Sequence, residues 1–191
     1  MHICTLASSS SGNCTLVSAG DTHILIDAGI SMRRIEKELN KNGLSCRDIS
    51  GILVTHEHTD HICGVKMMQK HYKTPLIMPE TVARDVEELV PETVGNIARV
   101  PVGEGFDFGD LHIKCFHTPH DTPESVGYKI TDGHRTFALA TDLGHISAEV
   151  LRELIGTDTA ILEANHDIEM LKCGPYPYYL KKRIASDSGH L

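Results

Sequence analysis

Length, composition and charge exclude several classes of protein. The chain has 191 residues, enough for a well-buried core, and no shift in composition marks a second domain. It contains no stretch of about 18 apolar residues, and its N-terminus lacks the basic and apolar regions of a signal peptide. We therefore expect one cytoplasmic domain over residues 1–191 with no membrane span.

Charge and cysteine content exclude further kinds of binding site. The formal net charge of -8 argues against a generally basic nucleic-acid surface, although it leaves a local one open. The six cysteines form no C-x-x-C pair, which excludes a zinc knuckle or thiol redox motif of that kind. The 13 histidines are many for this length and are the main compositional signal.

The first part of the chain predicts a small meander followed by a helix. Three apolar runs are separated by Gly, Ser, Asn and Asp, which are turn residues. Ser31 precedes Ile35 and Leu39, which have helical spacing, and it can cap that helix. The predicted strands cover residues 3–6, 14–18 and 23–26.

The middle of the chain alternates apolar runs with helical patterns, which is typical of βα units. A strand over residues 51–55 leads into a histidine cluster. Further along, we expect a helix over residues 65–70, a strand over 75–78 and a helix over 80–89.

The second half is richer in strands, separated by Gly, Pro and Asp turns. Strands with helices at both ends of the chain favour two sheets packed face to face and covered outside by helices. The expected strands cover residues 97–102, 111–116, 127–130 and 136–140, followed by a helix over 147–155 and a buried strand over 159–162.

The sequence Thr-His-Glu-His-Thr-Asp-His at residues 55–61 holds four candidate metal ligands directly after an apolar strand. In an extended segment side chains alternate faces, so His56 and His58 point the same way and can hold one ion. If a helix begins near His61, then Asp60 and His61 turn away and serve a second ion. Two cations about 3.5–4 Å apart that share a hydroxide suit a displacement reaction. The alternative is a solvated, histidine-rich turn.

Further polar residues follow other apolar strands. His120 would complete a three-histidine set for the first ion, with one position open. Asp142 has two carboxylate oxygens and could bridge both ions. His117 is at an odd spacing from His120, so we expect it on the other face. Asp27 follows another apolar strand and is placed to support the cluster without binding the ion, by orienting a ligand or a helix cap near it.

These residues resemble the successive motifs of the metallo-β-lactamase fold superfamily. The resemblance implies an α/β (α+β) fold, an αββα sandwich of two mixed sheets flanked by helices, with a dinuclear site at one edge. That architecture agrees with the predicted element order. The residues that carry the resemblance are Asp27, His56, His58, Asp60, His61, His120 and Asp142.

Longer segments are similar to the YycJ (WalJ) branch, bacterial proteins described as DNA exonucleases that act from the 5′ end. That family continues past Gly189-His190-Leu191 into a further helix and a last histidine ligand. The resemblance therefore implies a chain incomplete at its C-terminus that lacks one ligand of the second ion. The matching segments are residues 8–14, 25–29, 118–121, 162–167, 174–177 and 189–191.

The resemblance implies a phosphodiesterase that depends on two divalent metal ions and degrades DNA from 5′ to 3′ by means of a metal-bridging hydroxide. We expect zinc, with manganese as the alternative, and His120 and Asp60 as catalytic residues, with Asp60 moving a proton. The alternatives are a metallo-hydrolase of a small ester or thioester, and a non-catalytic fragment that binds metal or DNA. The oligomeric state is left open.

The expected partner is DNA, either single-stranded or at its 5′ ends, and several residues are expected to contact it. Ser10, Ser11 and Asn13, in the serine-rich loop, can bind a terminal phosphate, or the loop is a flexible hairpin. His166 follows a strand and either faces the substrate cleft or caps its loop. His190 resembles a family position close to the site.

Overall fold

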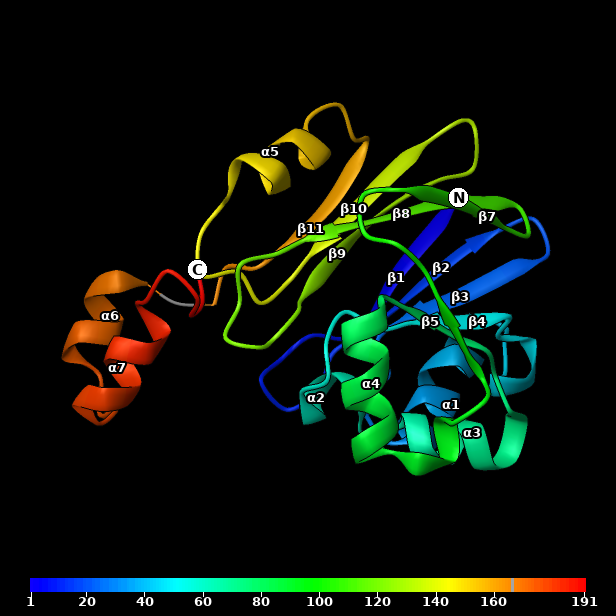
Figure 1. Cartoon of the computed structure of the whole chain (residues 1–191), viewed down its shortest axis with the longest axis horizontal. Coiled ribbons are helices and arrows are strands. Elements are labelled where there is room, and N and C mark those ends of the chain that lie inside the picture. Colours follow the sequence, from blue (N-terminus) through cyan, green and yellow to red (C-terminus); the bar gives the residue numbers. More distant parts are fainter. Residues whose placement is uncertain (166) are drawn as a thin grey trace.

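The computed structural model describes residues 1–165 and 167–191 and forms four layers, a group of helices, two β-sheets and a single helix (Figure 1). This is the αββα sandwich that the sequence predicts. Both sheets mix parallel and antiparallel pairs.

Sheet A has six strands in chain order from one edge to the other. The first three pair antiparallel, and the last three add in parallel because helices cross between them. Its strands are β1 (His2–Ala7), β2 (Cys14–Ala19), β3 (Thr22–Ile26), β4 (Gly51–Leu53), β5 (Leu76–Met78) and β6 (Ile97–Arg99).

Sheet B has five strands in the reverse of chain order. The two strands that come last in the sequence are parallel to each other, and all other neighbours in this sheet are antiparallel. Its strands are β7 (Gly105–Phe108), β8 (Leu111–His117), β9 (Val126–Thr131), β10 (Thr136–Ala140) and β11 (Thr159–Leu162).

The helices cover the two outer faces of the sandwich (Figure 1). On sheet A lie α1 (Met32–Lys41), α3 (Val65–Tyr72) and α4 (Glu80–Leu89), and α5 (Ala148–Leu154) lies on sheet B. The short α2 (Thr59–Ile62) sits at one end of the sheets, and α6 (Ile168–Cys173) and α7 (Tyr178–Ile184) stand beyond that end. The 3₁₀ turns are η1 (Cys46–Asp48) and η2 (Pro91–Thr93). Among the described residues, no helix has both the length and the hydropathy that a membrane crossing requires.

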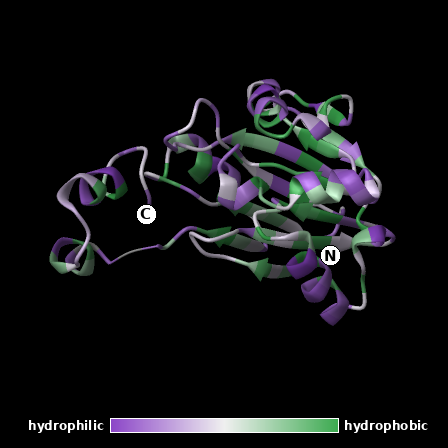
Figure 2. Ribbon diagram, turned by 90° about the horizontal axis from the view of Figure 1, so that it is seen from below, coloured by the Kyte–Doolittle hydropathy of each residue, from purple (hydrophilic) through white to green (hydrophobic). Residues whose placement is uncertain are grey.

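Three groups of buried side chains hold the layers together. One packs sheet A against α1, α3 and α4, a second fills the space between the sheets, and a third lies under α5. The two C-terminal helices, which mix hydrophobic and hydrophilic residues, stand apart from the layered body (Figure 2). The ends of β3, β4, β8 and β10, which carry polar motifs, are thus fixed by the burial of their strands.

Most predicted elements agree with the structure, and the exceptions are two strands of sheet B, the strand predicted over 97–102, which ends at Arg99, and two helices. The helices α6 and α7 had no counterpart in the prediction. Ser31 caps α1 by accepting a hydrogen bond from the backbone of Arg34, and α4 covers the predicted residues 80–89. The strand over 159–162 was expected to be buried, and this is wrong. It forms an edge of sheet B, where the side chain of Leu162 is 42% exposed. The strand β7 had no counterpart in the prediction.

Candidate metal centre

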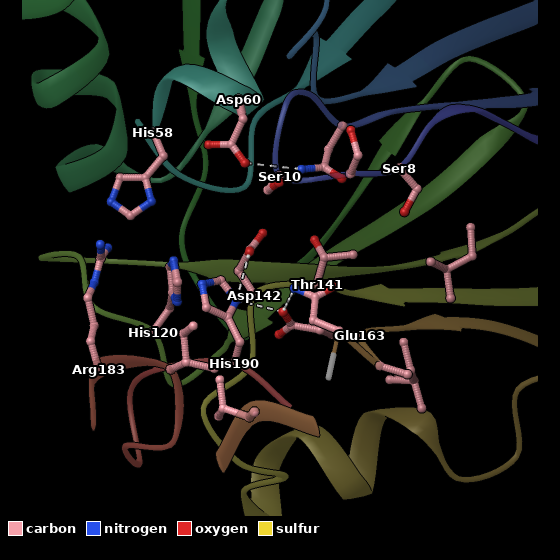
Figure 3. A pocket seen from close by; sticks show the side chains of 18 of the residues that line it. Ser8, Ser10, His58, Asp60, His120, Thr141, Asp142, Glu163, Arg183 and His190 are labelled. Atoms are coloured by element: carbon pink, nitrogen blue, oxygen red, sulfur yellow. Dashed lines mark hydrogen bonds and ion pairs between the residues drawn. The ribbon is translucent and has the colours of Figure 1, made fainter. Parts of the chain in front are cut away.

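The polar motifs lie where strands of both sheets end at the same edge of the sandwich. Asp27 follows β3, Asp142 follows β10, and Glu163 follows β11 directly. In Figure 3, His58 and Asp60 line one side of a cleft, and residues from the second half of the chain face them across it. The edge therefore collects imidazoles and carboxylates that are distant in sequence.

Three histidines of the 55–61 segment lie against one another. His58 is the N-cap of α2, so the backbone changes there from extended to helical, close to the predicted position. The ring centroid of His56 is 4.6 Å from that of His58 and 4.1 Å from that of His61. His56 and His61 are buried, whereas His58 faces the cleft. A partly buried imidazole cluster of this kind matches a metal site and does not match a solvated turn.

Within the described residues, three sets of side chains could each hold a metal ion, because their ligand atoms lie within 4.8 Å of one another. The first set is the predicted three-histidine set. Asp142 belongs to both of the others, as expected of a bridging carboxylate. The sets are His56, His58 and His120, then His56, His61 and Asp142, then His120, Asp142 and His190.

Asp60 lies at the edge of this arrangement. Its Oδ2 atom is 3.6 Å from Nε2 of His61 and accepts a 3.4 Å hydrogen bond from Asn13. None of the three sets includes it. Asp60 remains within reach of the same space, since its side chain is 31% exposed and lines the cleft opposite Asp142 (Figure 3).

The chemistry of these atoms fits divalent metal ions. Nε2 of His56, Nδ1 of His120 and Oδ2 of Asp142 are buried and make no hydrogen bond among the described residues. Burial lowers the pKa of both His56 and His120, so these imidazoles are neutral and keep a free lone pair. Buried polar atoms without partners are costly, and a bound cation would satisfy all three.

Asp27 lies next to the histidine cluster and contacts His61. Its carboxylate accepts hydrogen bonds from the backbone and hydroxyl of Thr55 and from Nδ1 of His61, the last at 2.8 Å. Burial by itself lowers the pKa of His61, but the carboxylates of Asp27 and Asp142 raise it to about 10. Because Nδ1 of His61 contacts Asp27, Nε2 of the same ring faces Asp142. Nε2 lies 2.8 Å from Oδ2 of Asp142, close enough for an ion pair, but the angles do not fit a hydrogen bond.

The carboxylate of Asp142 stays ionised in this setting. Burial by itself raises its pKa, but the His61 ring outweighs that effect and holds the pKa well below its usual range. Asp142 has a left-handed backbone with φ of 55°, as Asp27 has with 61°. Such a conformation is uncommon outside glycine, and Asp is one of the residues that tolerate it.

A cleft of about 670 Å³ opens over these residues. Ser10 and Asn13 line it, as predicted for the serine-rich loop. Ser11 is exposed and is not among the lining residues. His117, expected on the other face, is exposed as well. His166, predicted to face the cleft or cap its loop, lies outside the described residues.

The structure places His190 inside the cleft and adds a partner that the sequence did not single out. Nδ1 of His190 donates a 2.6 Å hydrogen bond to Glu163, and the His190 ring centroid is 5.2 Å from that of His120. The hydrogen bond to Glu163 raises the pKa of His190. The signal for Glu163 was available, because it follows an apolar strand just as Asp142 does.

Arg183 is a further cleft residue that the sequence did not assign to the site. It makes a 2.6 Å ion pair with Asp121, and Oδ1 of Asp121 lies 3.2 Å from Nε2 of His120. Its guanidinium points toward His58 and His120 (Figure 3). A fixed positive charge therefore borders the metal-ligand cluster.

Comparison with known proteins places this geometry in a family. Residues 22–191 match the family model described as the beta-lactamase superfamily domain. The chain is 37% identical to exodeoxyribonuclease YycJ of Bacillus anthracis, and the match covers 100% of this chain and 73% of that protein. It is 34% identical to exodeoxyribonuclease WalJ of Streptococcus pneumoniae, over 97% of this chain and 70% of that protein.

Solved structures share the fold. Zinc-bound PqqB from Methylobacterium extorquens superposes with a TM-score of 0.74 at 16% identity, over 93% of this chain and 78% of that one. An identity this low establishes the fold alone. The family model and the two relatives extend the assignment: the chain belongs to the metallo-β-lactamase superfamily of metal-dependent hydrolases, in the branch of YycJ and WalJ.

Proposed function

We propose that this chain is a phosphodiesterase with two divalent metal ions that removes nucleotides from the 5′ end of DNA. The observation that carries the proposal is the group of buried ligand atoms on His56, His120 and Asp142 that make no hydrogen bond among the described residues. The exodeoxyribonuclease relatives, at 34% and 37% identity, support the choice of DNA.

The ligand sets suggest how two ions would be held. His56, His58 and His120 would hold the first ion and His61 and Asp60 the second, with Asp142 between them. Two such cations, zinc or alternatively manganese, would activate a water molecule and neutralise charge on the phosphate. Asp60 is exposed toward the same space and is the residue that we assign to moving the proton of that water.

We assign the binding of the terminal phosphate to the serine-rich loop. Ser10 and Asn13 line the cleft beside Asp60, and the side-chain amide of Asn13 already donates a hydrogen bond to that carboxylate. Hydroxyl and backbone N–H groups of such a loop are good phosphate donors. The 5′ phosphate would lie against this loop, with the next phosphodiester over the metal ligands.

On the other side of the cleft, we assign to His190 the protonation of the leaving oxygen. Its hydrogen bond to Glu163 keeps the ring oriented beside His120 and favours its protonated form. A positioned imidazole of raised pKa is suited to act as a general acid at neutral pH.

The proposal is tested with single-stranded DNA labelled at either end, with zinc and manganese supplied in turn. His120→Ala should abolish turnover without unfolding the protein, because the residue lies at the edge of the sheets. His117→Ala is the matched control, since His117 is three residues away but exposed. Wild-type turnover in His120→Ala would overturn the site assignment, and products released first from the 3′ end would overturn the polarity.

Two further measurements test the substrate contacts. Removal of the 5′ phosphate should slow the wild-type protein but not the Ser10→Ala variant. His190→Ala should slow hydrolysis of DNA far more than hydrolysis of bis(p-nitrophenyl) phosphate, because p-nitrophenolate leaves without a proton. Equal losses on both substrates would contradict the role of His190 as an acid.

A further inference from the structure

The hairpin formed by α6 and α7, residues 168–185, concentrates aromatic and basic side chains in an otherwise acidic chain. Three of the five tyrosines of the chain lie within one four-residue stretch of it, and it holds four basic residues but a single acidic one. The whole chain, by contrast, carries a net charge of -8. The residues are Tyr176, Tyr178, Tyr179, Lys172, Lys181, Lys182 and Arg183, with Glu169 as the one acid.

These side chains do not serve the core of the described structure. Tyr178 is 72% exposed and Tyr179 is 74% exposed, and α7 has no buried residue. Nζ of Lys182 lies 5.0 Å from the centre of the Tyr178 ring and makes no ion pair with any described residue. The one acid, Glu169, is already paired with Lys172. The hairpin therefore presents aromatic rings and net positive charge to its surroundings.

The hairpin is continuous with the cleft of the metal centre. Tyr176 and Arg183 line that cleft together with His58. A second hollow of about 620 Å³, lined by Tyr178 and Lys182, shares Leu171 and His190 with the first. Figure 1 places α6 and α7 beyond the same end of the sheets as α2, the helix that carries Asp60 and His61.

We propose that the α6–α7 hairpin binds the single-stranded DNA that extends from the cleft, with Tyr178 and Tyr179 stacking on bases and Lys181 and Lys182 binding phosphates. The inference rests on the proposed function and names the form of DNA that the site takes. Aromatic rings interleaved with basic side chains are the combination that binds single strands, because every base can stack and every phosphate carries charge. The charge of the hairpin is complementary to that occupant, in contrast to the rest of the chain.

The test is binding of the metal-loaded protein to a fluorescent 20-nucleotide oligothymidylate whose 5′ linkages are phosphorothioates that resist hydrolysis. Tyr178→Leu/Tyr179→Leu keeps the apolar character but removes the rings, and should weaken binding at least about twenty-fold. Tyr178→Phe/Tyr179→Phe keeps the rings and should retain the affinity. Lys181→Gln/Lys182→Gln should reduce the slope of log affinity against log salt by about 1.4, because each phosphate that a lysine neutralises contributes about 0.7 to that slope.

Lys37→Gln/Lys41→Gln is the charge-matched control, because both are exposed residues of α1 and neither lines the two hollows. Its binding should equal that of the wild type. Circular dichroism and metal content verify that the hairpin variants are folded. Unchanged affinity in the leucine variant with an unchanged salt slope in the glutamine variant would overturn the proposal. The proposal would also be overturned if sedimentation showed that the wild type is a dimer and that the leucine variant is a monomer, because a second copy of the chain would then occupy the surface. The protected oligonucleotide reports binding alone. If the nuclease proposal fails, this appears in a separate assay, in which unprotected DNA stays intact.

Discussion

Nδ1 of His61 donates a 2.8 Å hydrogen bond to the carboxylate of Asp27, and this contact turns Nε2 of the same ring toward Asp142. The bond joins the end of β3 to the first turn of α2, so it links the framework of sheet A to the ligand cluster. Both aspartates have left-handed backbones, at φ of 61° and 55°. The backbone is therefore in an unfavourable conformation at both of the aspartates that contact the His61 ring. This indicates that the surrounding structure fixes the position of the ring.

Asp27→Asn should therefore weaken metal binding without unfolding the protein. Asparagine preserves the volume and can still accept from Thr55, but it removes the charge that orients and polarises His61. Loss of such a supporting carboxylate typically costs 10–100-fold in metal affinity, and we expect a loss of about that size for zinc. Competition with a chromophoric chelator measures it.

Asp107→Asn is the matched control. Asp107 also contacts a histidine, His112, at 2.6 Å, but that pair is exposed and distant from the cleft. Its zinc affinity should equal that of the wild type. An Asp27→Asn variant with unaltered affinity would show that the His61 ring needs no such support.

Metal binding should also depend on pH through His61. When no metal is bound, the pKa of about 10 keeps His61 doubly protonated at neutral pH, so a metal ion has to displace a proton. Burial lowers the pKa of His56 well below its usual range, so this ligand releases none. Zinc affinity should accordingly rise with pH from about 6 to 9, by about ten-fold per unit for one displaced proton.

Calorimetry in two buffers of different ionisation enthalpy counts the released protons. The count in Asp27→Asn should be smaller than in the wild type, because the carboxylate that raises the pKa of His61 is gone. Equal counts in the two proteins would locate the proton on another group, such as a bound water molecule.

Periodicity and capping predicted most of the fold, because the signals are local. The spacing of apolar residues and the cap at Ser31 place α1, and the apolar run at residues 76–78 places β5. The exposure of β11 could not be predicted from its sequence, since the same apolar run is found in central strands and in edge strands. Whether another strand lies beside Leu162 is a property of the tertiary structure.

The ligand cluster was predictable because spacing brings His56 and His58 together and strand ends bring in His120 and Asp142. The Glu163–His190 and Asp121–Arg183 pairings were not, since each joins segments far apart in the chain. The local signal at Glu163, a carboxylate after an apolar strand, does not identify its partner. The single domain over residues 1–191 stays a prediction. The role of each ligand also stays a prediction, to be measured with the variants above.

Gly29 offers a test of how closely the loops around the site are packed. Its amide donates to the carbonyl of Asn13 at 2.8 Å, and the amide of Asn13 donates to the carbonyl of Asp60 at 2.8 Å. A Cβ atom at position 29 would lie 1.6 Å from that Asp60 carbonyl oxygen, which belongs to the backbone and cannot rotate away. Gly29→Ala should therefore displace the serine-rich loop from α2 and lower the free energy of unfolding by about 1–3 kcal/mol.

Because the displaced segments carry Asn13 and Asp60, Gly29→Ala should lose metal affinity and turnover as well as stability. Gly43→Ala is the control: its Cβ meets nothing within 4 Å, although φ of +75° makes alanine strained there. Denaturant unfolding should show a cost in both variants, and metal titration should show a loss in Gly29→Ala alone. Normal metal binding by Gly29→Ala would mean that the loop contact is not what positions Asp60.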